Sequence, residues 1–272
     1  MDINVQSFAA HNLRRRPEPV EVGGFVAGFD PSTTDRNLNY ATPLPGARPT
    51  DRDVADLVEA FRARGLVPRL EFAPDGAPAV EPALRRAGFT TEAVHPYMVC
   101  TPATLVTPAG FRVPSADHPP VHVAVPRTDD DFAAIDAALS EAYGAEIPPA
   151  SVTNASATNA GAARLRRIEA GGGAVRFVRA PDGSCAGAAT CSAPAAGTAE
   201  LAGVGTRPAY RGRGIAAAVT ASLSETLFAR GAGSVWLEYE GEDARRIYER
   251  VGFRPHGTRL YMALENSEHP AP

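Results

Sequence analysis

The sequence predicts a mixed α/β protein built from two copies of one unit. A series of helical and strand patterns recurs in the same order in both halves of the 272-residue chain. The composition agrees, because 44% hydrophobic and 21% charged residues are ordinary values for a globular protein. At roughly 100–150 residues per domain, the length suits two small domains.

The repeated series runs helix, glycine, strand ending in Leu-Glu-aromatic, short helix ending in Gly-Phe, and strand containing Tyr-Met. The first half has DVADLVEAFRARGLVPRLEF, PALRRAGF and HPYMVC, and the second has AVTASLSETLFARGAGSVWLEY, RRIYERVGF and TRLYMAL. Gly88 and Gly252 are 252 − 88 = 164 residues apart, and Met98 and Met262 have the same separation. A period of domain size predicts two α/β domains and not a solenoid.

We therefore expect a first domain at 1–110, a linker at 111–120 and a second domain at 121–272. Residues 101–120 are rich in Pro, Thr and Ser and have no helical periodicity, which is typical of a linker.

The second half is expected to begin with a strand over VHVAV and a helix over DFAAIDAALSEAYG that Asp129 and Asp130 cap. ATNAGAARLRRIEAGGG predicts a second helix, AVRFVRA-PDGS-CAGAATCSA a hairpin, and TAELAGVGT a further strand. The next helix carries an apolar residue every fourth position, at Ile215, Val219, Leu223 and Leu227. Gly231 should end it, because glycine adopts the left-handed conformation there at little cost.

Composition limits the function. The net charge of −4 gives no reason to expect nucleic-acid or membrane partners, and the chain shows no long apolar run or secretory leader, so we expect a cytoplasmic protein. Cys100, Cys185 and Cys191 form no CxxC pair, which predicts buried free thiols and no metal site. All 27 basic residues are arginine, which excludes a P-loop or a Schiff-base lysine.

The stretch GVGTRPAYRGRGIA, residues 203–216, places glycines and arginines at the start of a helix. A helix start offers unpaired N–H groups and a positive dipole end, which favour a phosphate. Gly212 and Gly214 let the main chain approach the anion closely, and Arg211 and Arg213 add positive charge. Two alternatives stay open. The stretch could be only a flexible connection, or the GxGxxA pattern ending at Ala217 could bind a dinucleotide, although five residues separate it from the strand.

VGTRPAYRGRGIA resembles the acyl-CoA-binding motif of the GCN5-related N-acetyltransferase (GNAT) superfamily, Arg/Gln-x-x-Gly-x-Gly/Ala, in its R-G-x-G form. RRIYERVGF resembles the later motif of the same superfamily, a helix that carries a tyrosine and ends in Gly-Phe. Residues 121–264 follow the family's order of elements, and residues 20–106 resemble a shortened, degenerate copy. The resemblance implies two GNAT-like domains, each with a central, mostly antiparallel sheet flanked by helices, whose central strands splay apart near ELAGVGT.

The resemblance also implies a ligand, acetyl-CoA. The backbone of the strand end would bond its pantetheine arm, and the amides at the helix start would hold its pyrophosphate. The strand residues are Val204, Gly205 and Thr206. The helix-start residues are Arg211, Gly212, Arg213, Gly214, Ile215 and Ala216.

An amine that attacks a thioester needs a base for its proton, and the departing thiolate benefits from an acid. Glu200 lies on the strand, 11 residues before Arg211, as the base does in histone-acetylating members of the family. Glu238 or a water molecule is the alternative base. Tyr248 matches the family's tyrosine, and a phenol of pKa near 10 is protonated at neutral pH. Gly241 stands where many relatives carry an asparagine that bonds the CoA arm.

The first half has only one glycine in the corresponding PGARPTDRD, so we expect it to bind no CoA. The resulting hypothesis is an N-acetyltransferase that acts by direct attack on a small-molecule primary amine or a peptide N-terminus. The alternatives are a non-catalytic acyl-CoA sensor and, less favoured, a dinucleotide-dependent oxidoreductase. The acceptor, the acyl chain and the oligomeric state do not follow from the sequence.

Overall fold

The structure, a computed structural model, describes residues 2–106, 121–144 and 155–265. The predicted linker at 111–120 lies outside these residues. The chain divides into two compact units. Unit 1 comprises Met1–Tyr97 and His256–Pro272, and unit 2 comprises Met98–Pro255.

Unit 1 contains a sheet in the order β1-β2-β3-β4-β11-β5, in which β3 and β4 pair in parallel and β1–β2, β2–β3 and β4–β11 are antiparallel. Alternate strand residues point to opposite faces. Phe25 and Ala27 of β2 face the core under α2 and α3, and Val26 between them packs with Ala10 and Leu13 of α1. The elements are α1 (Asp2–Leu13), β1 (Glu18–Val22), β2 (Phe25–Phe29), β3 (Tyr40–Pro43), α2 (Asp51–Arg62), β4 (Arg69–Phe72), α3 (Val80–Arg86), β5 (Thr90–Cys100) and β11 (Arg254–Ala263).

Two strands divide their residues between the units. β11 ends the second half of the sequence, yet it pairs with β4 of the first half, with Leu260 opposite Phe72 and Met262 opposite Leu70. The end of β5 contributes Cys100 to the core of unit 2. Each unit therefore includes residues from both halves of the sequence.

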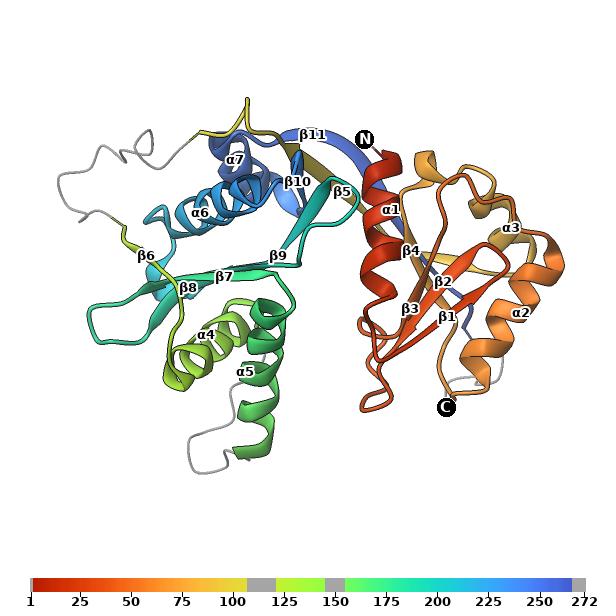
Figure 1. The fold of residues 1–272 in the computed structure, drawn as a ribbon, viewed down its shortest axis with the longest axis horizontal. Helices are drawn as coiled ribbons and strands as arrows, with labels where there is room; N and C mark the ends of the chain where they lie inside the picture. The colour runs from red at the N-terminus through yellow and green to blue at the C-terminus, as the bar shows by residue number, and fades with distance from the viewer. Residues whose placement is uncertain (1, 107–120, 145–154, 266–272) are drawn as a thin grey trace. The chain divides into compact units, whose positions relative to one another are not determined.

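Unit 2 contains the strands β10-β9-β8-β7-β6, antiparallel except for the parallel pair β9–β10. Helices α4 and α5 cover one face of this sheet, and α6 and α7 cover the other (Figure 1). The elements are β6 (Val123–Ala124), α4 (Asp129–Ala142), α5 (Ala155–Ala170), β7 (Ala174–Arg179), β8 (Cys185–Cys191), β9 (Thr198–Thr206), α6 (Ile215–Ala229), β10 (Ser234–Glu238) and α7 (Gly241–Val251).

The predicted helices, hairpin and strands of unit 2 are confirmed, with two corrections. The cap of α4 is Thr128 and not Asp129 or Asp130. The Thr128 hydroxyl accepts the N–H of Asp131 at 3.2 Å, and the Asp131 carboxylate accepts the N–H of Thr128 at 3.1 Å. Thr128 has the extended backbone that this reciprocal cap requires, whereas the two aspartates already belong to the first helical turn. The predicted strand over VHVAV is shorter, because only Val123 and Ala124 pair with β7.

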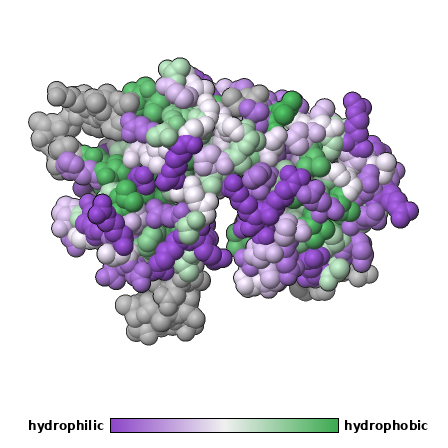
Figure 2. Space-filling view, in the orientation of Figure 1, coloured by the Kyte–Doolittle hydropathy of each residue, from purple (hydrophilic) through white to green (hydrophobic). Residues whose placement is uncertain are grey.

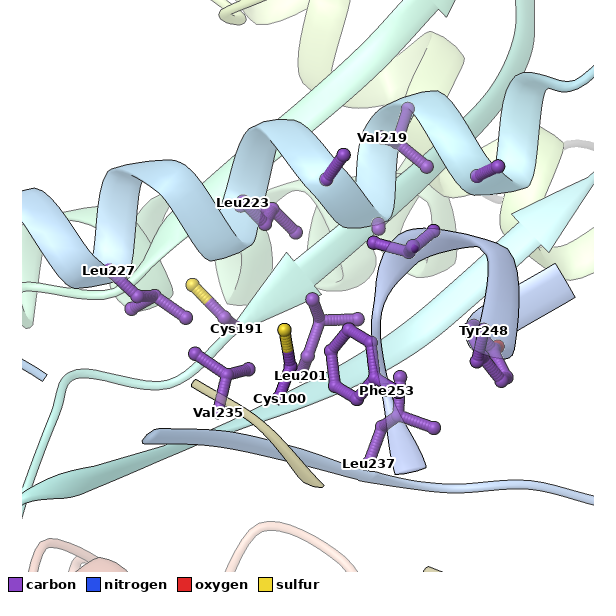
Figure 3. Close-up of a cluster of buried hydrophobic side chains, with 14 of the residues drawn as sticks. Cys100, Cys191, Leu201, Val219, Leu223, Leu227, Val235, Leu237, Tyr248 and Phe253 are labelled. Carbon is purple, nitrogen blue, oxygen red and sulfur yellow. The ribbon is translucent and has the colours of Figure 1, made fainter. Parts of the chain in front are cut away.

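The core between the sheet and α6 contains the predicted stripe of Ile215, Val219, Leu223 and Leu227, all buried. Figure 3 labels Val219, Leu223 and Leu227 of this stripe. Gly231 follows the helix with a φ of +88°, as the sequence predicts.

The three cysteines are buried free thiols, which confirms that prediction. Burial raises the pKa of both Cys185 and Cys191 to about 11, so at neutral pH these side chains are thiols and weak nucleophiles.

Hydrophilic and apolar residues are interspersed on the face of the molecule seen in Figure 2. Within the described ranges, no helix combines the length and the apolar character needed to cross a membrane.

Candidate functional site

The paired strands β9 and β10 part midway along β9. Their register covers Thr198–Ser234, Ala199–Val235 and Glu200–Trp236. Beyond it β9 runs on to Thr206 and β10 to Glu238. On the other side of β9, the register with β8 shifts between Ala188 and Thr190, next to Gly203 with its φ of +63°. A bulge of this kind bends a strand and increases its twist. The second half of β9 therefore presents an edge that β10 does not cover.

The main-chain groups on that edge can be assigned from alternation along the strand. The N–H of Arg207 donates to the carbonyl of Ala186 at 3.0 Å, so Arg207 directs its main-chain groups toward β8. Residues at even separation direct theirs to the same side, and their neighbours to the other side. The carbonyls of Val204 and Thr206 therefore point to the uncovered edge of β9.

Helix α6 begins without a side-chain cap. Its N-cap is Gly214, with a φ of +76°, and its first turn holds no acidic residue. Helices α2 and α4 differ in both respects, because each has a threonine capping box and acidic residues in its first turn. Uncapped N–H groups and the positive dipole end together favour an anion at the start of α6.

The residues before α6 form a short 3₁₀ turn, Pro208–Tyr210, followed by the glycine turn. Gly212 has a φ of +76° and open space where a side chain would lie. The guanidinium of Arg211 donates to the carbonyls of Thr206 and Ala142, at 3.3 Å each. Arg213 donates to the carbonyl of Ala209 at 3.2 Å and lies over the Tyr210 ring. Both arginines add positive charge to the turn.

The hydroxyl of Thr206 is buried and has no hydrogen-bond partner among the described residues. A buried hydroxyl without a partner costs about 1–3 kcal/mol. This unpaired group lies at the end of β9, among the residues expected to contact the pantetheine arm. It is consistent with a polar ligand at this place.

The last turn of α4 lies against the same part of β9. A side chain at Gly205 would come within 2.9 Å of both Ala142 and Leu139, so only glycine permits this approach. The Tyr143 hydroxyl donates to the carbonyl of Val204 at 3.1 Å. No sequence pattern indicates this contact, because the two residues are 61 positions apart and Tyr143 ends an ordinary amphipathic helix.

Tyr248 lies on α7, at the edge of the core, with its ring centroid 6.2 Å from that of Phe253 (Figure 3). In the described part of the chain its hydroxyl makes no hydrogen bond. Burial raises the pKa of Tyr248 above its usual value, and the negative charge of an ionised Tyr143 raises it further. The Tyr248 phenol therefore stays protonated throughout the neutral range.

Glu200 is half-buried and lies where the pairing with β10 ends, opposite Trp236. Its neighbours Ala199 and Leu201 pack in the core under α6 and α7. Alternation along the strand therefore places the Glu200 side chain on the opposite face, which α4 and α5 cover. Glu238, the alternative base, is half-buried at the end of β10.

Other parts of the molecule are weaker candidates for a functional site than the region of β9 and α6. Within the described ranges, no three His, Cys, Asp or Glu side chains gather as a metal site would require. A cavity of about 610 Å³ lies in unit 1, between the start of β1, the loop after β2 and the end of α2. It contains none of the predicted site residues.

These features define a class of protein. A strand that parts from its neighbour, followed by a glycine turn and an uncapped helix, has a geometry that suits an extended, anionic ligand. The antiparallel arrangement of β7, β8 and β9 differs from the parallel sheet that a dinucleotide-binding fold has. Residues 139–253 match the family described as Acetyltransferase (GNAT) family. The matched segment contains both motifs on which the predicted resemblance to this family rests, the glycine turn before α6 and the helix α7.

Solved structures agree on the fold. A GCN5-related N-acetyltransferase from Kribbella flavida is 24% identical, with a TM-score of 0.75, over 98% of this chain and 96% of that one. A tandem GNAT protein from the clavulanic acid biosynthesis pathway is 11% identical, with a TM-score of 0.60, over 100% and 96%. A GCN5-related N-acetyltransferase from Sphaerobacter thermophilus is 18% identical, with a TM-score of 0.54, over 89% and 76%. The comparison with curated proteins gave no match.

Proposed function

We propose that the chain is an N-acetyltransferase that transfers the acetyl group of acetyl-CoA to a primary amine, on a small molecule or a peptide N-terminus. One observation carries the proposal. The helix after the glycine turn begins uncapped and without acids, whereas α2 and α4 begin with capping boxes and acids. The start of α6 is suited to an anionic ligand in the segment that matches the acetyltransferase family.

Two groups of main-chain atoms would bind acetyl-CoA. The amides from Arg211 to Ala216 surround its pyrophosphate, where the glycines allow close approach and the arginines add charge. The uncovered edge of β9, from Val204 to Thr206, bonds the amides of the pantetheine arm as a neighbouring strand would. The main chain of Val204 also donates to the oxygen of the thioester carbonyl as it becomes negative.

The chemistry uses the two faces of the sheet. Glu200, on the face covered by α4 and α5, accepts a proton from the amine, directly or through water. The amine nitrogen attacks the thioester carbon, and the carbon–sulfur bond breaks. Tyr248, on the face of α6 and α7, gives its proton to the departing thiolate. Water then returns a proton to the phenolate, which the raised pKa of Tyr248 favours. Direct transfer fits the raised pKa values of the buried Cys185 and Cys191 thiols.

Unit 1 would bind no acyl-CoA. The start of α2 is closed by Thr50, whose hydroxyl accepts the N–H of Asp53, while the Asp53 carboxylate accepts the N–H of Thr50 at 2.7 Å. Asp51 adds a further negative charge in that turn. These carboxylates already occupy the helix start and would repel a phosphate.

The test places a carboxylate at the start of α6. Ala216 is the second residue of the helix and is half-buried. Ala216→Glu should retain or slightly increase the melting temperature, because an acid near a helix start stabilises it. Its affinity for acetyl-CoA, measured by calorimetric titration, should fall about tenfold or more relative to the uncharged control Ala216→Gln.

Equal affinities in the two variants, or no binding of acetyl-CoA to the wild-type chain, would refute the proposal. Release of free CoA in the presence of a panel of amines then tests catalysis. Binding without CoA release from any amine would instead favour an acyl-CoA sensor.

A further inference from the structure

The contact between Tyr143 and Val204 has a consequence for ligand binding that rests on the proposed function. The Tyr143 hydroxyl donates to the Val204 carbonyl at 3.1 Å, and Tyr143 as a whole is 63% exposed. The same tyrosine approaches Gly205, because a Cβ there would lie 3.7 Å from its ring. An exposed side chain from α4 thus covers main chain that is expected to bind the pantetheine arm.

Both carbonyls on the uncovered edge of β9 are already hydrogen-bonded to side chains. Tyr143 donates to Val204, and the Nε of Arg211 donates to Thr206 at 3.3 Å. An amide N–H of a ligand that pairs with this edge needs the same carbonyls. Side chains and ligand therefore compete for the same acceptors.

We propose that Tyr143 is a residue of the acyl-CoA site that sets its affinity, because its hydroxyl competes with an amide N–H of the pantetheine arm for the Val204 carbonyl. The free chain spends part of its time with the hydroxyl on Val204. Acetyl-CoA binds when the phenol has turned away.

The surroundings of Tyr143 permit this movement. The last turn of α4 is fixed by two other contacts, the ion pair of Glu141 with Arg207 at 2.7 Å and the bond from Arg211 to the Ala142 carbonyl. The main chain of α4 therefore does not depend on the tyrosine. Because most of the side chain is exposed, it can rotate into solvent without leaving a cavity in the core.

The position of the Tyr143 hydroxyl indicates which end of the bound ligand it would lie near. Ionised Tyr143 raises the pKa of Tyr248, so the two phenols are close enough for their charges to interact. Tyr248 is the proposed acid for the thiolate. The Tyr143 hydroxyl is bonded to Val204, whose main chain is the proposed donor to the thioester oxygen, so Tyr143 lies toward the thioester end of the site.

Tyr143→Phe removes the hydroxyl and keeps the ring. Because a competing bond is lost only from the free chain, the variant should bind acetyl-CoA about 3- to 10-fold more tightly than the wild-type chain. Stopped-flow measurements should show that the higher affinity comes from faster association of acetyl-CoA, with an unchanged dissociation rate. Tyr210→Phe is the control, because Tyr210 lies in the 3₁₀ turn between β9 and α6 and its described contacts use only its ring.

The outcomes are distinct. A wild-type chain that binds acetyl-CoA, with Tyr143→Phe of equal or lower affinity, overturns this inference and leaves the proposed function standing. Weaker binding of Tyr143→Phe through a faster dissociation rate would show that the hydroxyl bonds the bound ligand. Failure of the wild-type chain to bind acetyl-CoA refutes the proposed function and the inference together.

Discussion

The guanidinium Nε of Arg207 lies 2.7 Å from the Glu141 carboxylate, and this ion pair joins the end of β9 to the last turn of α4. Each side chain is 29% exposed, so the pair is only partly shielded from water. Two further contacts lie next to this pair. Tyr143 bonds to Val204, and Arg211 bonds to both Thr206 and Ala142. The pair therefore helps to hold α4 over the uncovered edge of β9.

Glu141→Gln should reduce the free energy of unfolding by about 1 kcal/mol, because it removes the charge of a partly buried pair and keeps the shape of the side chain. Urea unfolding at low ionic strength measures the loss. Glu242→Gln on α7 is the control. Glu242 pairs with Arg246 at 3.5 Å, both side chains are mostly exposed, and its loss should be close to zero. Similar losses in the two variants would contradict the shielded character of the first pair.

Tyr248→Phe should lower kcat about 100-fold or more and leave the affinity for acetyl-CoA nearly unchanged, because the phenol donates a proton only after the attack. Burial raises the pKa of Tyr248, so its proton is retained below its ordinary value of about 10. The wild-type rate should therefore show no loss from this group as the pH rises to about 10. Steady-state assays of CoA release over pH 6–10 check both statements. Normal turnover by Tyr248→Phe would show that the acid is another group.

Glu71→Gln should reduce the free energy of unfolding by about 3 kcal/mol, because Glu71 is the shared partner of two buried arginines of unit 1. Its carboxylate lies 2.5 Å from Arg69 and 3.6 Å from Arg259, and both arginine side chains are at most 5% exposed. Chemical denaturation provides the measurement, with the exposed Glu81→Gln on α3 as the control for a surface pair with Arg85. A loss below 1 kcal/mol for Glu71→Gln would show that water or rearrangement replaces the missing charge.

Acid should destabilise the chain through Asp131. The N–H of Arg127, with the Arg179 guanidinium and the Thr128 cap, lowers the pKa of Asp131 to about 2, whereas an unfolded aspartate has a pKa near 3.9. A lowered folded pKa contributes stability that is present above pH 4 and lost as the pH falls toward 2. After allowance for solvent screening, the loss should be about 1–2 kcal/mol.

Unfolding of the wild-type chain and of Asp131→Asn at several pH values between 5 and 2 would isolate this contribution. The difference in stability between the two proteins should shrink as the pH falls. A difference independent of pH would contradict the assignment.

Local patterns predicted most of the elements. The apolar residues spaced four apart placed α6, and the glycines at 231 and 252 marked helix ends with positive φ. Capping was harder to predict, because Thr128, Asp129 and Asp130 are all good capping residues and only the backbone conformation selects among them. The glycine turn could be recognised because its chemistry is contained in a few consecutive residues.

The sequence by itself determined the order of elements, the apolar faces and the glycine turn, since these depend on residues a few positions apart. Only the tertiary structure decided that β11 pairs with β4, that Arg207 meets Glu141, and that Tyr143 covers Val204. Such contacts join residues separated by tens to hundreds of positions. They depend on how whole elements pack, and an approach as close as that at Gly205 follows from the volumes of side chains on two elements at once.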